Sequence, residues 1–181
     1  MNKLLTTLAI LLIATASYAQ NYVVERVLDG DTIAVITPIG TFEKVRMIGI
    51  LTPKSNSNDE DEGDEDDATL FVKGLIKPGQ YIRLRFENQE RDQDGRLLAY
   101  VYYLIGSTKE YANYMQVPEY YEVSLEEKKF NIHGYYFNFL NATIIKAGYA
   151  APMPTPPNVK YASRFRKWYE EAREQKRGLW K

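Results

Sequence analysis

Apolar and polar positions alternate through much of the first half of the chain, with the period that is typical of half-buried β-strands. The pattern predicts five strands, over residues 22–28, 32–37, 41–50, 80–86 and 96–103. Asp29-Gly30 separates the first two strands and Asp94-Gly95 lies between the last two, and both dipeptides favour tight turns. The first half of the chain is therefore predicted to form a sheet built largely from hairpins.

Helical periodicity replaces this alternation in three segments, over residues 68–77, 139–147 and 158–177. Pro78-Gly79 follows the first segment and Gly148 follows the second, as expected at helix C-termini. A Pro-rich bridge over residues 150–157 precedes the third. Five strands with a helix between the third and fourth fit an α+β fold, a five-stranded, partly open β-barrel of the OB type with about three helices.

Two segments do not fit either period. Residues 54–67 are polar and strongly acidic, which predicts a loop. Residues 107–136 are rich in Tyr, Glu and Lys without clean periodicity, and we interpret them as an inserted loop or an extra hairpin. Residues 20–181 are otherwise expected to form one domain, since their number suits a single core.

The N-terminus has the features of an export signal. Lys3 supplies a positive charge, residues 4–16 form an apolar run too short to span a bilayer, and Ser17-Tyr18-Ala19 is a small-x-small cleavage site. We predict a signal peptide over residues 1–19 and a secreted or periplasmic mature protein without a stable membrane anchor. The absence of cysteine from the sequence excludes disulfides and thiolate metal sites.

The net charge of −1 hides an uneven distribution. Residues 59–67 contain eight acids and no base, whereas the predicted mature chain without that run has 22 basic and 16 acidic residues, or +6. The segment 160–181 alone carries eight Lys or Arg against three Glu. A basic body of this kind is compatible with a polyanionic partner such as nucleic acid.

The candidate chemistry centres on residues 45–54, with the sequence V-R-M-I-G-I-L-T-P-K. Arg46 lies among the apolar residues Val45, Met47 and Ile48 of a predicted strand, where a buried charge needs a partner or a function. Arg46 is otherwise interpreted as a charge on a strand edge. The motif Asp29-Gly30-Asp31-Thr32 is by itself more typical of a hairpin turn, and it gains interest only beside Arg46 and Arg96.

Five motifs in order resemble the staphylococcal (micrococcal) nuclease, or thermonuclease, family. They are D-G-D-T (29–32), V-R-M-I-G-I-L-T-P-K (45–54), D-Q-D-G-R-L-L-A-Y-V-Y (92–102), N-A-T-I-I-K-A-G-Y-A (141–150) and the ending A-R-E-Q-K-R-G-L-W (172–180). The resemblance covers nearly all of the predicted mature chain except the Tyr-rich insertion. It implies the OB-type fold and calcium-dependent hydrolysis of DNA and RNA.

The family's chemistry uses residue types that suit a phosphodiester. As the resemblance implies, one Ca2+ is held by two aspartates and a threonine carbonyl, since a hard cation prefers oxygen ligands. A glutamate positions or deprotonates the attacking water. Two arginines bind the scissile phosphate, because the guanidinium fork matches phosphate oxygens and keeps its charge.

Part of this set is present. By the resemblance, Asp31 is the first metal aspartate and Thr52 the metal-binding threonine, while Arg46 and Arg96 are the catalytic, phosphate-binding arginines. The second metal aspartate falls on Leu51, which has no donor atom.

Two further family positions also differ. The water-activating glutamate falls on Lys54, which carries the opposite charge, and a nucleotide-packing tyrosine falls on Asp94. Protonated Lys54 is instead a candidate phosphate-binding residue. Loss of a general base costs about 100- to 10,000-fold in rate. The sequence therefore predicts an incomplete Ca2+ site and a loss or impairment of calcium-dependent hydrolysis.

The acidic run leaves alternatives open. It is a solvated loop, an inhibitory segment that mimics phosphate on Arg46 and Arg96, or a replacement set of metal ligands. The function we favour is binding of DNA, RNA or nucleotides through the two arginines without efficient calcium catalysis. The alternatives are an active secreted endonuclease that uses acids of residues 59–67, or a non-catalytic anion- or protein-binding module of the cell envelope.

Overall fold

The computed structural model describes residues 22–53, 65–107 and 135–181. The predicted signal peptide, Lys54, the greater part of the acidic loop and the middle of the Tyr-rich insertion lie outside the described residues.

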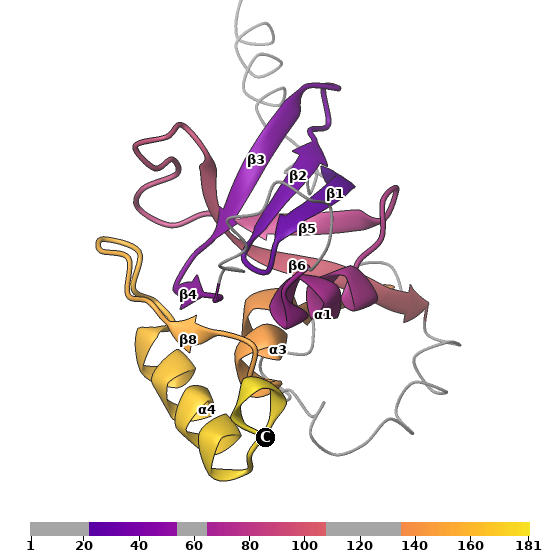
Figure 1. The fold of residues 1–181 in the computed structure, drawn as a ribbon. Helices are drawn as coiled ribbons and strands as arrows, with labels where there is room; N and C mark the ends of the chain where they lie inside the picture. The colour runs from indigo at the N-terminus through magenta and orange to yellow at the C-terminus, as the bar shows by residue number, and fades with distance from the viewer. Residues whose placement is uncertain (1–21, 54–64, 108–134) are drawn as a thin grey trace, which may run out of the picture.

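Five strands close into a barrel, which confirms the predicted fold (Figure 1). They are β1 (Tyr22–Asp29), β2 (Thr32–Ile36), β3 (Phe42–Met47), β5 (Tyr81–Arg85) and β6 (Leu97–Ser107). Strand β1 pairs with both β2 and β5, and β5 pairs with β6. The barrel closes where β3 pairs with β6 in parallel, through Val45 opposite Leu97 and Arg46 opposite Leu98.

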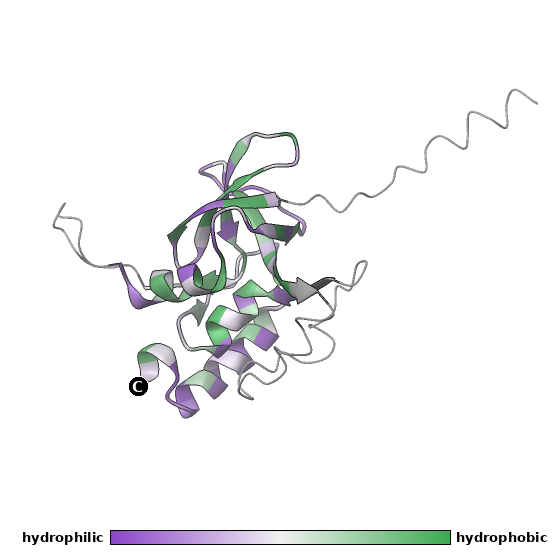
Figure 2. Ribbon diagram, turned by 90° about the vertical axis from the view of Figure 1, so that its right-hand side faces the viewer, coloured by the Kyte–Doolittle hydropathy of each residue, from purple (hydrophilic) through white to green (hydrophobic). Residues whose placement is uncertain are grey.

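Alternation along the strands fills the barrel interior. Val24, Ile33, Val35, Val45 and Met47 are at most 1% exposed. Figure 2 shows hydrophobic positions running along the barrel strands, whereas α4 carries many hydrophilic positions. Burial of these side chains supplies the main favourable free energy of the fold.

The three predicted helices are present as α1 (Asp67–Leu75), α3 (Leu140–Lys146) and α4 (Ala162–Glu174), followed by the 3-10 turn η2 (Gly178–Trp180). Helix α4 begins four residues later than predicted, because buried Asn158 is used elsewhere. Its amide nitrogen donates to the Gln89 carbonyl (2.7 Å), and its oxygen accepts from the Gln89 amide (2.9 Å). None of the helices that the structure describes is long and apolar enough to cross a membrane.

The predicted third strand, 41–50, is in fact two strands. Gly49 has φ of +81° and ends β3, after which β4 (Ile50–Leu51) pairs with β8 (Ala151–Pro152) in the Pro-rich bridge. A β-carbon on Gly49 would lie 2.6 Å from the Phe165 ring of α4. Glycine is therefore needed here for two reasons. It adopts the positive φ of the turn, and its lack of a side chain leaves room for Phe165 of α4.

The ends of the predicted insertion are strands. Strand β6 continues to Ser107, and it pairs with antiparallel β7 (Tyr135–Phe139). The segment between them lies outside the described residues.

An aromatic cluster joins this end of the sheet to the helices. Tyr102 stacks on Phe139 with ring centroids 4.8 Å apart, and Tyr100 meets Tyr161 edge-to-face at 4.7 Å. Phe139 also contacts Phe165 of α4 at 5.9 Å. These contacts fix α3 and α4 against the barrel.

Candidate functional site

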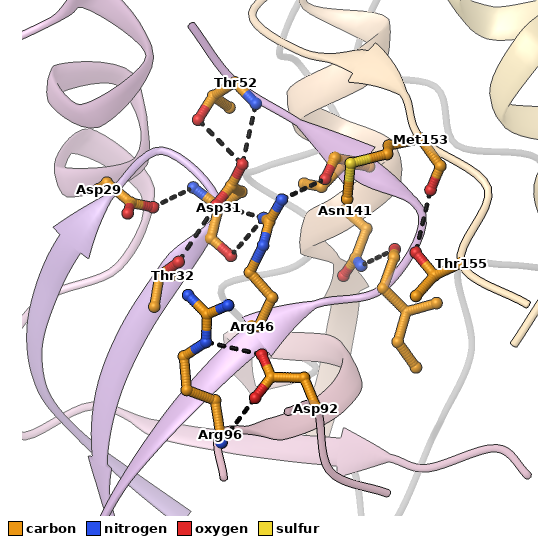
Figure 3. A network of polar contacts seen from close by, with 12 residues as sticks. Asp29, Asp31, Thr32, Arg46, Thr52, Asp92, Arg96, Asn141, Met153 and Thr155 are labelled. Carbon is orange, nitrogen blue, oxygen red and sulfur yellow. Dashed lines mark hydrogen bonds and ion pairs between the residues drawn. The ribbon is translucent and has the colours of Figure 1, made fainter. Parts of the chain in front are cut away.

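Three segments that are distant in the sequence bring the candidate residues together. Asp31 lies in the turn between β1 and β2, Arg46 lies on β3, and Thr52 follows β4. The register of β2 and β3 places Thr32 opposite Arg46, which puts the turn beside the arginine. Figure 3 shows Asp31 between Thr52 and Arg46.

The Asp31 carboxylate is fully engaged with protein donors. Its Oδ2 accepts hydrogen bonds from the Thr52 amide (2.9 Å) and the Thr52 hydroxyl (3.2 Å). Its Oδ1 accepts from the Thr32 hydroxyl (3.1 Å) and forms an ion pair with Arg46 Nη1. Four donors on two oxygens account for about the full acceptor capacity of a carboxylate.

The same enclosure affects the ionisation of Asp31. Burial raises the pKa of its carboxyl, whereas the Arg46 guanidinium and the Thr52 amide lower that pKa. The acid is only 3% exposed. Asp31 therefore depends on Arg46 to remain charged in a low-dielectric environment.

Arg46 is also held by internal groups. Its Nη1 donates to the Asp31 carbonyl (3.3 Å) and its Nη2 to the Ile50 carbonyl (3.1 Å). Strand β3 is paired on both sides at this residue, so the interpretation of Arg46 as a strand-edge charge is wrong. Only 11% of its side chain is exposed, which leaves little surface for a ligand.

Arg96 is arranged differently. Asp92 Oδ2 accepts from Arg96 Nε (2.7 Å), Asp92 Oδ1 accepts from the Arg96 amide (2.9 Å), and Asp94 forms an ion pair with Nη2 at 3.0 Å. The Arg96 side chain is 31% exposed, and its Nη1 has no hydrogen-bond partner among the described residues. Asp92 thus fixes the guanidinium (Figure 3), while part of the Arg96 side chain is exposed to solvent.

An open groove of about 650 Å³ runs past Arg96 along the outer face of the barrel. Its lining carries basic and acidic side chains together: Arg26, Lys44, Arg96, Glu25, Glu43 and Asp94. Phe42 also lines it and is 71% exposed. An aromatic ring beside an accessible arginine suits a nucleotide chain, because bases stack on aromatic rings and phosphates pair with guanidinium.

The described residues do not fit the calcium site that the resemblance implies. The Asp31 oxygens already have four protein donors, and Leu51, which is 43% exposed beside Thr52, offers no oxygen. Within residues 22–53, 65–107 and 135–181 no three His, Cys, Asp or Glu side chains gather as a metal site. Lys54 and residues 59–64 lie outside that part of the chain, so their predicted roles stay predictions.

The described end of the acidic run has a structural role. Asp66 is the N-cap of α1, and its carboxylate accepts from the Thr69 amide and the Thr69 hydroxyl, both at 2.8 Å. Glu65 forms an exposed ion pair with Lys73, which lies in the last turn of α1. Asp66 therefore stabilises the start of the helix, where a carboxylate also meets the positive end of the helix dipole.

Sequence reasoning missed two polar residues that support the site. Asp92 accepts hydrogen bonds from Arg96, and its position just before the D-G-R turn is the sequence feature that could have indicated this role. Asn141 is completely buried, donates to the Ile48 carbonyl (2.9 Å) and accepts from the Val101 amide (3.0 Å), so it ties α3 to both β6 and the end of β3. Its place as the one amide side chain in an apolar helical segment could have indicated a buried hydrogen-bonding role.

Comparison with known proteins agrees with this architecture. The family model described as "Staphylococcal nuclease homologue" matches residues 44–181. The thermonuclease of Staphylococcus hyicus is 30% identical over 89% of this chain and 76% of that protein, and the thermonuclease of Staphylococcus intermedius is 29% identical over the same shares. Endonuclease YncB of Bacillus subtilis is 31% identical over 88% of this chain and 61% of that protein. The chain therefore belongs to the staphylococcal nuclease homologue family.

Proposed function

We propose that this protein binds nucleic-acid phosphodiesters at the groove beside Arg96 and that calcium-dependent hydrolysis is lost or strongly impaired. The observation that carries the proposal is the contrast between the two halves of the site. Arg96 is held by Asp92 with Nη1 left open among the described residues, whereas the Asp31 oxygens are occupied by Thr32, Arg46 and Thr52.

Arg96 is the principal phosphate contact in this proposal. The Nε bond to Asp92 orients the guanidinium, and a preoriented donor loses less entropy when it binds an anion. Arg46 is paired with the Asp31 carboxylate, and in this proposal it adds positive charge near the bound phosphate. Lys54 is expected to add a third cation, and it follows Pro53, at which the described segment ends.

The proposed loss of hydrolysis follows first from the absence of a carboxylate at position 51. A family carboxylate there would be a second Ca2+ ligand, and leucine supplies none. The lysine at 54 in place of the water-activating glutamate removes the base, at a cost of about 100- to 10,000-fold. Loss of the metal adds to this, because the developing phosphate charge then has less stabilisation.

Export is a further part of the proposal. Residues 1–19 have the charge, apolar run and small-residue site of a signal peptide, so the protein is proposed to act outside the inner membrane, on extracellular or periplasmic nucleic acid.

An active endonuclease is the second candidate. The relatives reported above are named thermonucleases or endonucleases, which favours retained activity. In that case the missing carboxylates come from the acids of residues 59–67. A non-catalytic anion- or protein-binding module is the outcome if neither cleavage nor nucleic-acid binding is found.

The test measures cleavage and binding on the same protein. Single-stranded DNA and RNA are incubated with Ca2+ or with a chelator, and affinity for a labelled oligonucleotide is measured by fluorescence anisotropy across a range of salt. We expect binding without calcium-dependent cleavage. Arg96→Ala should weaken binding roughly 10-fold and reduce the salt slope by about 0.7, the value for one phosphate contact on a single strand.

The matched control is Arg166→Ala, an exposed arginine on α4 that should leave both readouts unchanged. Calcium-dependent cleavage by wild type that Arg96→Ala abolishes would establish the active-endonuclease alternative. If wild type is inert, Leu51→Asp combined with Lys54→Glu should create calcium-dependent cleavage. Equal affinity in Arg96→Ala and Arg166→Ala would contradict the proposed binding site.

A further inference from the structure

A second pocket, of about 310 Å³, lies where the C-terminal segment meets α1 and the end of α3. Its side-chain lining comes chiefly from Phe71, Tyr149, Lys176, Arg177 and Lys181. It shares no lining residue with the groove beside Arg96. In Figure 1 the C-terminal turn lies beside α3 and below α1. The volume is at the lower end of the range for small-molecule sites.

One wall of this pocket is aromatic. Phe71 of α1 and Tyr149 stack on each other, with ring centroids 4.5 Å apart and planes at 23°. Both side chains are only half-buried, so the stacked pair keeps an accessible surface. A rigid aromatic surface of this kind accepts a nucleobase by stacking, whatever the base.

The other wall is basic. Arg177 Nη1 donates to the Lys146 carbonyl (3.0 Å), which fixes the guanidinium without neutralising it. Within the described residues neither Lys176 nor Arg177 pairs with a carboxylate, and no acidic side chain lines the pocket. Lys181 also lines the pocket. The charges of Lys176 and Arg177 favour an anion, and a phosphate matches the guanidinium in shape.

The backbone that carries these cations is held in a costly conformation. Lys176 has φ of +50°, the one non-glycine residue with positive φ in the described chain. It occupies the left-handed position of a helix C-cap, where its amide donates to Arg173 and the Arg177 amide donates to Ala172. Glycine is the usual residue there. A lysine kept at this position at a conformational cost points to a use for its side chain.

Close backbone contact anchors the segment to α3. A β-carbon on Gly148 would lie 2.3 Å from the Arg177 carbonyl oxygen, and one on Gly178 would lie 2.5 Å from the Ala147 carbonyl oxygen. The Leu179 amide donates to the Gly148 carbonyl (3.2 Å). The two glycines therefore let the basic segment pack directly against the turn that carries Tyr149, so the pocket is preformed.

We propose that this pocket binds one nucleotide unit, with its base on the Phe71–Tyr149 wall and its phosphate between Lys176 and Arg177. The inference uses none of the residues of the proposed function and stands without it. Helix α1, which carries Phe71, also contacts the turn that carries Asp31, because a β-carbon on Gly30 would lie 2.8 Å from Ala68.

The test follows the amide signals of Ala147 and Gly178 by NMR in the purified protein, during titration with adenosine 5′-monophosphate and, separately, inorganic phosphate. We expect saturable shifts with the nucleotide and roughly 5- to 10-fold weaker binding of phosphate alone, since the stacking contact is then missing. Lys176→Gly should weaken nucleotide binding roughly 5- to 10-fold while raising the Tm, because glycine relieves the left-handed strain. Lys176→Arg should retain binding.

Opposite changes in affinity and Tm separate this proposal from a purely structural role of Lys176. Arg96→Ala should leave the Gly178 shift unchanged, which would show that the pocket binds independently of the groove beside Arg96. Absence of a saturable shift, equal affinity for phosphate and nucleotide, or full binding by Lys176→Gly would overturn it. A parallel titration with an oligothymidylate identifies the source of the ligand. If Lys176→Gly weakens that complex too, the ligand is a unit of a strand, and if not, it is a free mononucleotide.

Discussion

The two arginines of the site have the same chemistry and different surroundings. Arg46 donates to Asp31 and to the Ile50 carbonyl, and it is nearly enclosed. Arg96 is oriented by Asp92 at the rim of a groove. An arginine that must bind an external phosphate needs accessible N–H groups, so the environment rather than the residue type distinguishes their roles.

Asp94 forms an ion pair with Nη2 of Arg96, and 73% of the Asp94 side chain is exposed. An exposed carboxylate is a weak competitor for a phosphate on the same guanidinium. Asp94→Asn should therefore tighten binding of a single-stranded oligonucleotide by roughly 2- to 5-fold. Anisotropy titrations at low salt measure the change.

The matched control is Glu174→Gln, which removes one exposed acid at the end of α4. If both variants tighten binding equally, the gain comes from net charge alone and Asp94 does not compete for Arg96.

At the scale of elements, the β3–β4 junction links the site to the helices. Arg46 donates to the Ile50 carbonyl just after the junction, Asn141 of α3 donates to Ile48 just before it, and Phe165 of α4 packs on Gly49 within it. The helices therefore support the backbone that holds Arg46, although none of their residues belongs to the resemblance-derived site.

Gly49→Ala tests this linkage. A positive φ costs an alanine about 1 kcal/mol, and the β-carbon 2.6 Å from the Phe165 ring adds about 1–3 kcal/mol of overpacking. We expect a total loss of roughly 2–4 kcal/mol in the free energy of unfolding, measured with urea.

Gly40→Ala is the control, because Gly40 has φ of +85° but nothing within 4 Å of its would-be β-carbon. It should cost only the backbone part, about 1 kcal/mol. Equal losses in the two variants would mean that α4 does not restrain the junction.

At the scale of the whole molecule, the closed barrel buries tyrosines that then resist ionisation. Burial raises the pKa of Tyr100 well above its usual range, with Glu87 as the next cause. Tyr100 is 2% exposed and packs on both α4 and the loop before it, through Phe165 and Tyr161. Its neutral form is thus coupled to the intact fold.

Stability should therefore fall in alkali. Above about pH 10 the unfolded chain loses the Tyr100 proton while the folded chain keeps it, so the free energy of unfolding decreases as pH rises, by up to about 1.4 kcal/mol per pH unit for this group. Tyr100→Phe should show a shallower decrease in urea unfolding between about pH 8 and pH 11. Parallel curves for the two proteins would show that Tyr100 is not the group responsible.

The amino-acid sequence was sufficient to predict the strand periods, the three helices and the order of motifs that identifies the family. These depend on local alternation and on residue identity, which a chain displays before it folds. It also showed that Leu51 offers no metal ligand, because that follows from side-chain chemistry alone. Two of its errors were at boundaries, because Gly49 splits a predicted strand and Asn158 delays a predicted helix through bonds to Gln89. The third was the interpretation of Arg46 as a strand-edge charge.

The role of each charged residue depends on contacts that form when the chain folds. Asp31 meets Thr52 across 21 positions of sequence, and Arg46 meets Asp31 across 15. Likewise the basic pocket forms because Gly148 and Gly178 let two distant segments touch. Burial and hydrogen-bond partners depend on strand register and on the packing of helices from other parts of the chain. Local pattern does not contain that information, so the enclosure of Arg46 and the accessibility of Arg96 emerge only in the folded molecule.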